Sequence, residues 1–412
     1  MRNRHPELLI PASSLEVLKT AVMFGADAVY IGGEAFGLRA KAKNFSMEDM
    51  KEGVQFAHEH GARVHVTVNI LAHNDDLEGV AEYLKELKEI GPDAPIIADP
   101  AIFMLAKEIC PEIERHVSTQ ANNTNYGTFN FWWNLGAKRV VTARELSLKE
   151  IREIRAHIPA EMEIESFIHG AMCISYSGRC LLSNFFTGRD ANQGACTHPC
   201  RWKYSVVEET RPGEYMPVYE NERGTYIFNS KDLCMIEHIP EMIDAGIDSF
   251  KIEGRMKTAL YVATVARTYR KAIDDYLEDP KKYEANMPWY RDQISNCTYR
   301  QFTTGFYFGK PGDESQIYDS NTYIKEYTYL GIIGGIKDGM YRIEQRNKFS
   351  VGETVEIMKP DGQNVEVTVE KIIDEDGQEQ ESAPHPKQVL YVALSGEASV
   401  YDILRRQEGV TE

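Results

Sequence analysis

The sequence lacks several features that mark membrane proteins, secreted proteins and proteins with a broad nucleic-acid-binding surface. No apolar run approaches the roughly 18 residues that a membrane-spanning helix needs, so no membrane association is expected. The N-terminal segment lacks an apolar stretch before a small-residue cleavage site, which predicts a cytoplasmic protein. Basic residues are outnumbered, with 46 Lys and Arg against 63 Asp and Glu and a net charge of −17. This balance argues against a broad nucleic-acid-binding surface, so positive charge that binds RNA has to be local.

Cysteine is also scarce, but its distribution is uneven. Four of the seven cysteines follow the spacing C-x6-C-x15-C-x3-C, with Gly and polar residues between them. These four are Cys173, Cys180, Cys196 and Cys200. Clustered thiolates suit either tetrahedral zinc or an iron–sulfur cluster. The isolated Cys110 and Cys297 are predicted to be buried apolar residues, and a disulfide framework is not expected in a chain long enough to bury its own core.

The cysteine-rich stretch carries a family resemblance. The motif E-x-F-x-x-G-A-M-C at 165–173, followed by G-x-C-x-L-S at 178–183, resembles the signature of the collagenase-like peptidase family U32. The resemblance extends to STQANNTN, NQGACTHPCRW, NSKDL and SFKIEGRMK, and covers roughly residues 7–310. It implies a role in hydroxylation, since relatives act on a wobble uridine of tRNA, a ribosomal RNA base or a ubiquinone precursor. In the ubiquinone branch the cysteines bind a 4Fe-4S cluster, and there the position of Cys234 supplies a ligand.

The first two thirds of the chain alternate short apolar strands with amphipathic helices, which is typical of a parallel sheet wound by helices. Candidate strands cover 8–11, 28–31, 63–69, 95–99, 116–119, 139–142, 163–168, 226–229 and 249–253. A closed barrel needs eight strands, so one of the nine is expected to belong to an insertion. The prediction is a distorted (β/α)8 TIM-like barrel with a cysteine-rich insertion, followed by a small C-terminal all-β barrel.

Three segments are predicted along the chain. The barrel domain spans 1–280, with the insertion at about 171–225 forming a β-hairpin and a long helix running from Thr258 to about Leu277. Residues 281–322 are aromatic-rich and are expected to form an irregular connector. From 323 to 412 the strands are separated by Gly, Asp and Pro turns, as expected for the all-β domain.

In barrels of this type the active site lies at the C-terminal ends of the strands. Basic residues fall at these predicted ends, where Arg forks suit a carboxylate or phosphate. They are Arg39, Lys41, Lys43, Arg201, Lys251 and Arg255. The alternative is that they pair with local carboxylates such as Glu34 or Glu253.

Two further side chains are candidates for catalysis. His169 directly precedes the cysteine loop, and Gln120 follows the fifth predicted strand with three asparagines. His65 and His116 lie within strands, where a lone histidine is expected to be a hydrogen-bonded core residue.

The resemblance favours an iron–sulfur enzyme that makes 5-hydroxyuridine at the wobble position of tRNA, with zinc as the alternative metal. It also implies prephenate, a small dicarboxylate, as the anionic co-substrate, and tRNA as partner. A protein partner or a homo-oligomer is left open. Other hypotheses are hydroxylation of ribosomal RNA or a ubiquinone precursor, a non-catalytic RNA-binding subunit, and a peptidase. The sequence has neither H-E-x-x-H nor G-x-S-x-G, so a peptidase would need a cysteine beside His169 or His198, or a zinc-bound water.

Overall fold

The computed structural model describes residues 5–37, 44–173, 175–202, 205–207, 215–217, 231–297, 301–311 and 327–408. The chain divides into two compact units. The barrel unit comprises residues 1–19, 27–257 and 300–322, and the C-terminal unit comprises 20–26, 258–299 and 323–412. The boundary between them falls inside helix α1 (Leu15–Met23).

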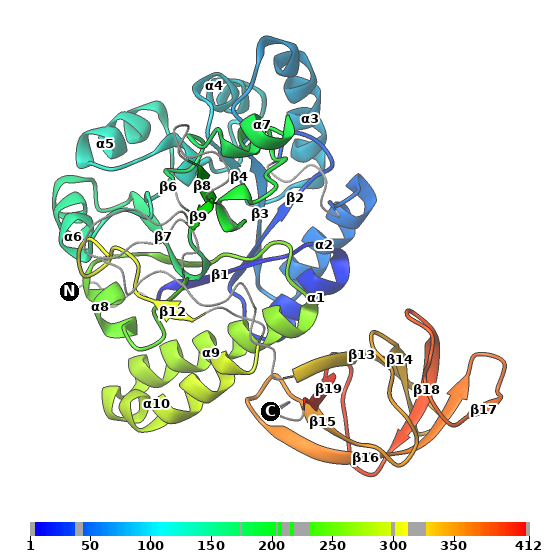
Figure 1. The fold of residues 1–412 in the computed structure, drawn as a ribbon. Helices are drawn as coiled ribbons and strands as arrows, with labels where there is room; N and C mark the ends of the chain where they lie inside the picture. The colour runs from blue at the N-terminus through cyan, green and yellow to red at the C-terminus, as the bar shows by residue number, and fades with distance from the viewer. Residues whose placement is uncertain are drawn as a thin grey trace. The chain divides into compact units, whose positions relative to one another are not determined.

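Eight parallel strands close into a barrel in the first unit, as the sequence predicted. Closure comes from β11, which pairs in parallel with both β1 and β7. The strands are β1 (Glu7–Pro11), β2 (Ala28–Gly32), β3 (Arg63–Val68), β4 (Ala94–Ile97), β5 (His116–Val117), β6 (Arg139–Val141), β7 (Glu163–Ala171) and β11 (Ser249–Ile252). Helices surround them (Figure 1). Those helices are α2 (Met47–Glu59), α3 (Leu77–Ile90), α4 (Pro100–Ile109), α5 (Tyr126–Leu135), α6 (Leu148–His157) and α8 (Ile239–Asp244).

Local sequence explains where these elements begin and end. The five residues of β2 are all buried, as expected for a strand covered on both faces. Ser147 begins α6 with a capping box, in which its hydroxyl accepts from the Glu150 amide and the Glu150 carboxylate accepts from the Ser147 amide. Gly91 ends α3 in the left-handed conformation that glycine adopts without a steric cost.

Two short strands that were not predicted from the sequence extend the sheet beyond the barrel. Strand β10 (Asp232–Cys234) pairs antiparallel with the end of β7, and β12 (Phe302–Thr303) pairs with β10. Because β10 continues the pairing, β7 runs to Ala171, three residues beyond the predicted end. The candidate strand at 226–229 lies outside the described residues. Within the insertion, β8 (Ser205–Val207) pairs antiparallel with β9 (Tyr215–Pro217).

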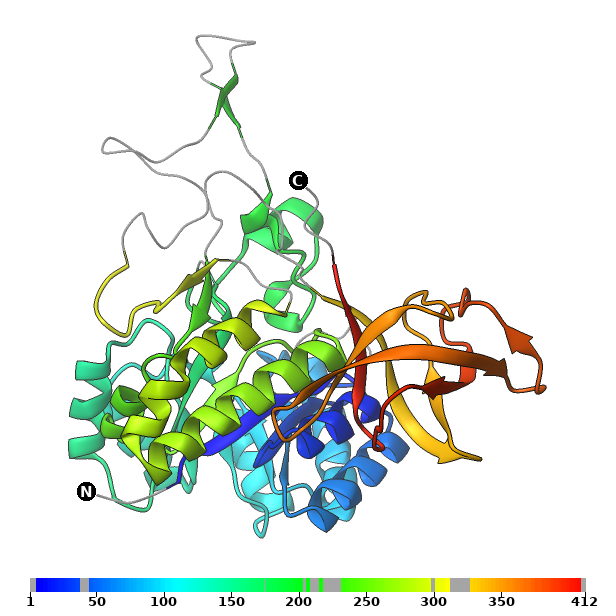
Figure 2. The ribbon, with the colours of Figure 1, turned by 90° about the horizontal axis from the view of Figure 1, so that it is seen from below.

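The C-terminal unit combines two helices with an antiparallel barrel. Helices α9 (Ala259–Glu278) and α10 (Pro280–Ser295) lie side by side (Figure 2). The expectation of an irregular segment after 280 is therefore wrong up to Ser295, because Asp279 caps α10 and Pro280 occupies its first turn. Six strands close in the order β15-β19-β13-β14-β18-β16, with β15 paired back to β16. The strands of this unit are β13 (Tyr327–Lys337), β14 (Met340–Glu344), β15 (Thr354–Met358), β16 (Asn364–Asp374), β17 (Glu379–Gln380), β18 (Val389–Leu394) and β19 (Ile403–Gln407).

The described residues contain no helix with the length and apolar character that crossing a membrane would require.

A buried carboxylate, Asp275, joins the two helices of the C-terminal unit. It accepts hydrogen bonds from Tyr290 and Asn286 and pairs with Lys271 and Lys282. Burial raises the pKa of Asp275, but these hydrogen bonds outweigh burial and hold the pKa well below its usual range. The stabilisation is therefore present above the unfolded pKa near 3.9 and is lost as the pH falls below it.

Replacing Asp275 with Asn is expected to lower the free energy of unfolding at pH 7 by about 1.5–3 kcal/mol, the usual range for hydrogen bonds to a charged group. The loss should shrink as the pH falls below 4, because the carboxyl of the unfolded wild-type chain then takes up a proton, which lowers the free energy of unfolding of wild type toward that of the variant. Urea unfolding at several pH values measures both effects. Asp274→Asn is the matched control, since Asp274 is half exposed and pairs with Arg270 within the helix. An equal loss in both variants would contradict the assignment.

Candidate functional site

A cavity of about 390 Å³ opens at the C-terminal ends of the barrel strands. Its wall is built by residues that follow strands β3, β5, β7 and β11, which is where a barrel of this type carries its chemistry. They include Asn69, Ser118, Thr119, Met172, Glu253 and Met256. Residues of the cysteine loop line the same cavity, so the insertion and the strand ends form one site.

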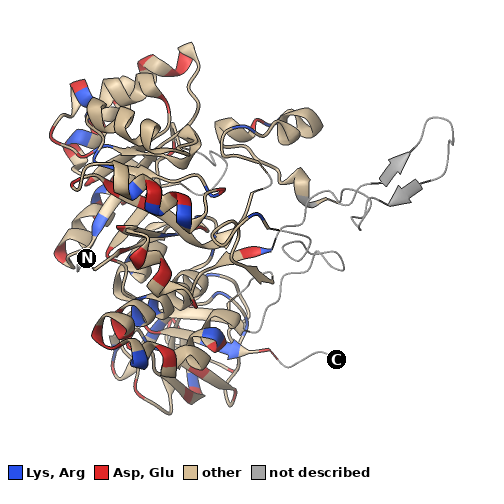
Figure 3. Ribbon diagram, turned by 90° about the vertical axis from the view of Figure 1, so that its left-hand side faces the viewer, with Lys and Arg blue, Asp and Glu red and all other residues tan. Residues whose placement is uncertain are grey.

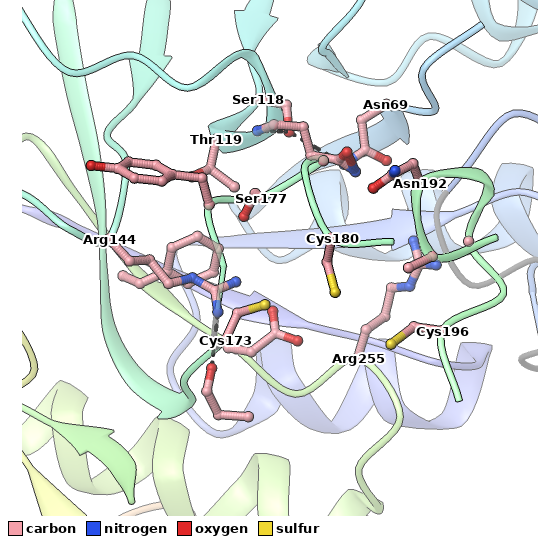
Figure 4. Close-up of a pocket in the computed structure, with 18 of the residues that line it drawn as sticks. Asn69, Ser118, Thr119, Arg144, Cys173, Ser177, Cys180, Asn192, Cys196 and Arg255 are labelled. Carbon is pink, nitrogen blue, oxygen red and sulfur yellow. Dashed lines mark hydrogen bonds between the residues drawn. The ribbon is translucent and has the colours of Figure 1, made fainter. Parts of the chain in front are cut away.

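Four cysteines line this cavity: Cys173, Cys180, Cys196 and Cys200. The sulfur atoms of Cys173, Cys180 and Cys196 face one space between Arg144 and Arg255 (Figure 4). Cys234 is not among the described lining residues; it lies on β10, opposite His169 of β7. The spacing in sequence thus brought together four soft donors around one cavity.

The two isolated cysteines are buried, as predicted. Cys110 and Cys297 are 1% and 2% exposed, and their thiols donate to the Ala106 and Ile294 carbonyls. Burial raises the pKa of Cys110, which keeps it a neutral thiol.

Two glycines allow the cysteine loop to approach the strand ends. Gly170 has φ +106°, and a Cβ there would lie 2.4 Å from the Glu253 carbonyl oxygen. Gly178 has φ +74°, and a Cβ there would lie 2.9 Å from Oε1 of Gln120. Any other residue at either position would combine backbone strain with a close contact. The glycines of the sequence motif are thus required by the packing of this loop.

Two of the six predicted basic residues lie in the cavity wall. Lys251 is 5% exposed, and its ammonium pairs with Glu165 at 2.6 Å and lies over the Tyr30 ring. Arg255 is 6% exposed and donates to the Thr67 hydroxyl at 2.7 Å. Lys251 thus pairs with a carboxylate, as the alternative reading expected, although the partner is Glu165 rather than Glu253.

The remaining predicted basic residues are not described in the same detail. Arg39, Lys41 and Lys43 lie outside the described residues. Arg201 ends a short helical turn, Pro199–Arg201, and its side chain is also outside the described part.

Arg144 and Arg189 also line the cavity, and sequence reasoning missed both. The guanidinium of Arg144 stacks on Phe167 at 4.2 Å and donates to the Ala171 carbonyl at 2.9 Å. Arg144 follows the end of β6 by three residues, so the strand-end rule that selected Arg255 would also have found it. Arg189 follows the insertion helix α7 (Leu182–Thr187), and no comparable sequence signal marks it.

Gln120 is placed in the cavity wall, with 4% of its surface exposed. Its Oε1 is buried and has no hydrogen-bond partner among the described residues, so it is available to a ligand. The neighbouring asparagines have structural roles. The Asn123 amide donates a hydrogen bond to the Ser118 carbonyl and accepts one from the Trp132 indole. Asn125 is the N-cap of α5.

His169 is buried on β7 and is not among the described residues that line the cavity. Burial, with the charge of Lys257, lowers the pKa of His169 to about 3, so the ring is neutral. It packs against Phe302 at 5.7 Å between ring centres. His198, by contrast, does line the cavity, next to Cys196 and Cys200.

Charge outside the cavity is mixed. Figure 3 shows Lys and Arg intermingled with Asp and Glu on the helices. Positive charge at the site therefore comes from individual side chains of the cavity wall. This arrangement suits a small anion more than a long stretch of nucleic-acid backbone.

Comparison with known proteins adds an independent finding. The sequence model of a family described as Peptidase family U32 matches residues 13–317, and that of the Peptidase family U32 C-terminal domain matches residues 325–405. The chain is 43% identical to tRNA hydroxylation protein P1 of Bacillus subtilis (strain 168), over 98% of this chain and 95% of that protein. It is 39% identical to tRNA hydroxylation protein P of Escherichia coli (strain K12), over 92% of this chain and 91% of that protein. The 23S rRNA 5-hydroxycytidine C2501 synthase of Escherichia coli (strain K12) is 40% identical over 66% of this chain and 40% of that protein.

Proposed function

The chain belongs to peptidase family U32, and within that family we propose that it takes part in the 5-hydroxylation of the wobble uridine of tRNA. One observation carries the proposal: relatives named for tRNA hydroxylation match nearly the whole chain, across both units. The relative named for ribosomal RNA shares less than half of its own length with this chain. This difference favours tRNA over ribosomal RNA as the substrate.

The cysteine loop is the proposed holder of a 4Fe-4S cluster, with Cys173, Cys180 and Cys196 as ligands and Cys200 or Cys234 as the fourth. Around one zinc ion, with Zn–S bonds of about 2.3 Å, tetrahedral sulfur ligands lie roughly 3.8 Å apart. Among the described residues, no three cysteine sulfurs lie within 4.8 Å of one another. A four-iron cluster binds each thiolate at a different iron and so accepts sulfurs that lie farther apart than those around one zinc ion. When bound, such a cluster supplies redox or Lewis-acid chemistry.

The cations of the cavity wall are the proposed binding site for a small anionic co-substrate, which the family resemblance identifies as prephenate. Arg144 and Arg255 flank the space that the cysteine sulfurs face (Figure 4). The Arg144 guanidinium stacks on Phe167, and the Arg255 guanidinium donates a hydrogen bond to Thr67. A volume of about 390 Å³ lies in the range for a small-molecule site. These residues would hold and orient the acid beside the sulfur ligands.

The target base would have to leave its stack to reach this cavity, as is general for enzymes that act on a nucleobase. Exposed aromatic side chains of the insertion offer faces on which an unstacked base can lie. They are Tyr176, Phe185, Phe186 and Trp202, with 44–81% of their surface exposed. Tyr176 also lines the cavity, which connects these aromatic residues to the proposed site.

Deleting the gene is expected to remove 5-hydroxyuridine and its derivatives from tRNA, and mass spectrometry of tRNA nucleosides measures this. Expression of the wild-type chain should restore them. Unchanged tRNA together with a lost hydroxylation in ribosomal RNA would favour that substrate instead. Unchanged RNA together with gelatin cleavage that depends on Cys173 would favour the peptidase alternative.

A further inference from the structure

One layer below the cavity, the barrel encloses three side chains of the kind that bind metals. They are His65 of β3, His116 of β5 and Glu165 of β7, all with 0% exposure. Their candidate ligand atoms lie within 4.8 Å of one another. Each stands two residues before a cavity-lining residue, namely Thr67, Ser118 or Phe167, and so points to the same inward side. None of the three lines the cavity itself, so this cluster is separate from the cysteine site.

The two histidines lack the hydrogen bonds expected of buried core residues. The four ring nitrogens of His65 and His116 have no hydrogen-bond partner among the described residues, which corrects the expectation of a satisfied core. The rings meet edge to face with centres 4.6 Å apart. Nε2 of His116 lies 3.5 Å from a Glu114 oxygen without the geometry of a hydrogen bond. Leaving such groups unpaired in a barrel interior is costly, so a partner for the nitrogens is expected there.

Imidazole nitrogens are common metal ligands, because a neutral ring has a free lone pair on one nitrogen.

Glu165 is already oriented as a metal-binding carboxylate usually is. Its Oε2 accepts from Arg139 at 3.2 Å, and its Oε1 accepts from Lys251 at 2.6 Å. Each carboxylate oxygen keeps a second lone pair, so these contacts leave room for one metal bond. Hydrogen bonds of this kind commonly fix the ligands of metal sites.

Charges of both signs surround the cluster. Arg139 pairs with Glu7 and Glu163 as well as Glu165. Arg63 pairs with Glu7 and Glu114, and Lys138 pairs with Glu163. The cations near the histidines are therefore each paired with a carboxylate, and a divalent ion would not enter a field of one positive sign.

We propose that the interior of the barrel binds one divalent ion of the zinc class through His65, His116 and Glu165. Two imidazoles and a carboxylate are a ligand set that zinc accepts, whereas the thiolates of the cysteine loop suit iron–sulfur chemistry. The ion would join strands β3, β5 and β7 beneath the cavity floor. Because its ligands do not reach the cavity, its role is to hold the barrel floor rather than to contact the substrate.

The test uses the full-length protein with its iron–sulfur site intact. After dialysis against zinc chloride and removal of free metal, elemental analysis is expected to find about one zinc per chain in addition to iron. Zinc X-ray absorption should show nitrogen and oxygen ligands without sulfur. Absence of zinc after this loading, or zinc bound only by sulfur, would overturn the proposal, and neither result depends on a variant that has to fold.

Matched variants then locate the ion. His116→Gln is expected to lower zinc content at least tenfold with iron unchanged, and Cys173→Ser should lower iron with zinc unchanged. His58→Gln is the control, because His58 is half exposed and pairs with Asp93 on the surface. Equal zinc in the His116→Gln and His58→Gln proteins would overturn the assignment. The reciprocal loss of one metal in each variant separates this site from the cysteine site.

Discussion

Replacing Cys173 with serine is expected to remove iron from the protein and to abolish tRNA hydroxylation. Serine keeps the size of the side chain but replaces a soft thiolate with a hydroxyl, which is a poor ligand for iron–sulfur clusters. Mutating a group that only hydrogen-bonds to a metal ligand lowers metal affinity by about 10–100-fold. Loss of a ligand itself should therefore reduce iron content at least as much. Cys173 is exposed, so little packing energy is lost. Iron content of anaerobically purified protein and tRNA mass spectrometry provide the measurements.

The same result is expected for Cys180→Ser and Cys196→Ser. The pair Cys200→Ser and Cys234→Ser identifies the fourth ligand, because only one of the two is expected to lose the cluster. Position in the cavity wall favours Cys200, and the family resemblance favours Cys234.

Buried cysteines away from the cavity provide the controls. Cys110→Ala and Cys297→Ala should keep full iron content. A colourless wild-type protein that binds zinc through the sulfurs of the cysteine loop would contradict the iron–sulfur proposal. The assignment of the ligands would still hold.

Replacing Arg255 with Gln is expected to lower tRNA hydroxylation about 10–100-fold, because hydrogen bonds to a charged group contribute about 1.5–3 kcal/mol. Arg255→Lys should recover only part of the activity, since an ammonium cannot reproduce the two-pronged contact of a guanidinium with a carboxylate. The measurement is hydroxylation as a function of the concentration of the small acid, together with tRNA affinity measured separately. If Arg255 binds the acid, a higher acid concentration restores activity and tRNA affinity is unchanged.

Arg152→Gln is the matched control for Arg255. Arg152 is 43% exposed and pairs with Asp244 on the outer surface, so its loss should leave hydroxylation unchanged. Iron content and melting temperature of the Arg255 variants should stay close to wild type. Weaker tRNA binding with an unaltered response to the acid would instead assign Arg255 to a phosphate of the RNA.

The barrel was predictable because its strands and helices are encoded locally. Alternation of short apolar runs with amphipathic helices predicts a parallel wound sheet, and strand ends in such a sheet meet at one face. Lys251 and Arg255 were found by this rule, and Arg144 was accessible to it. The extension of β7 to Ala171 was not, because it depends on pairing with β10 from 61 residues farther along the chain.

The cysteine spacing and the glycine positions of the 165–183 segment already indicated a metal-binding loop over the barrel mouth, because soft donors and turn residues are properties of the sequence itself. Only the tertiary structure decided which groups share a space. It placed Gln120 in the cavity wall, where its Oε1 has no hydrogen-bond partner among the described residues, and it buried His169 on β7. It also brought His65, His116 and Glu165 together from strands far apart in the chain. The physical reason is that barrel closure and strand register determine which side chains meet, and neither can be read from local periodicity.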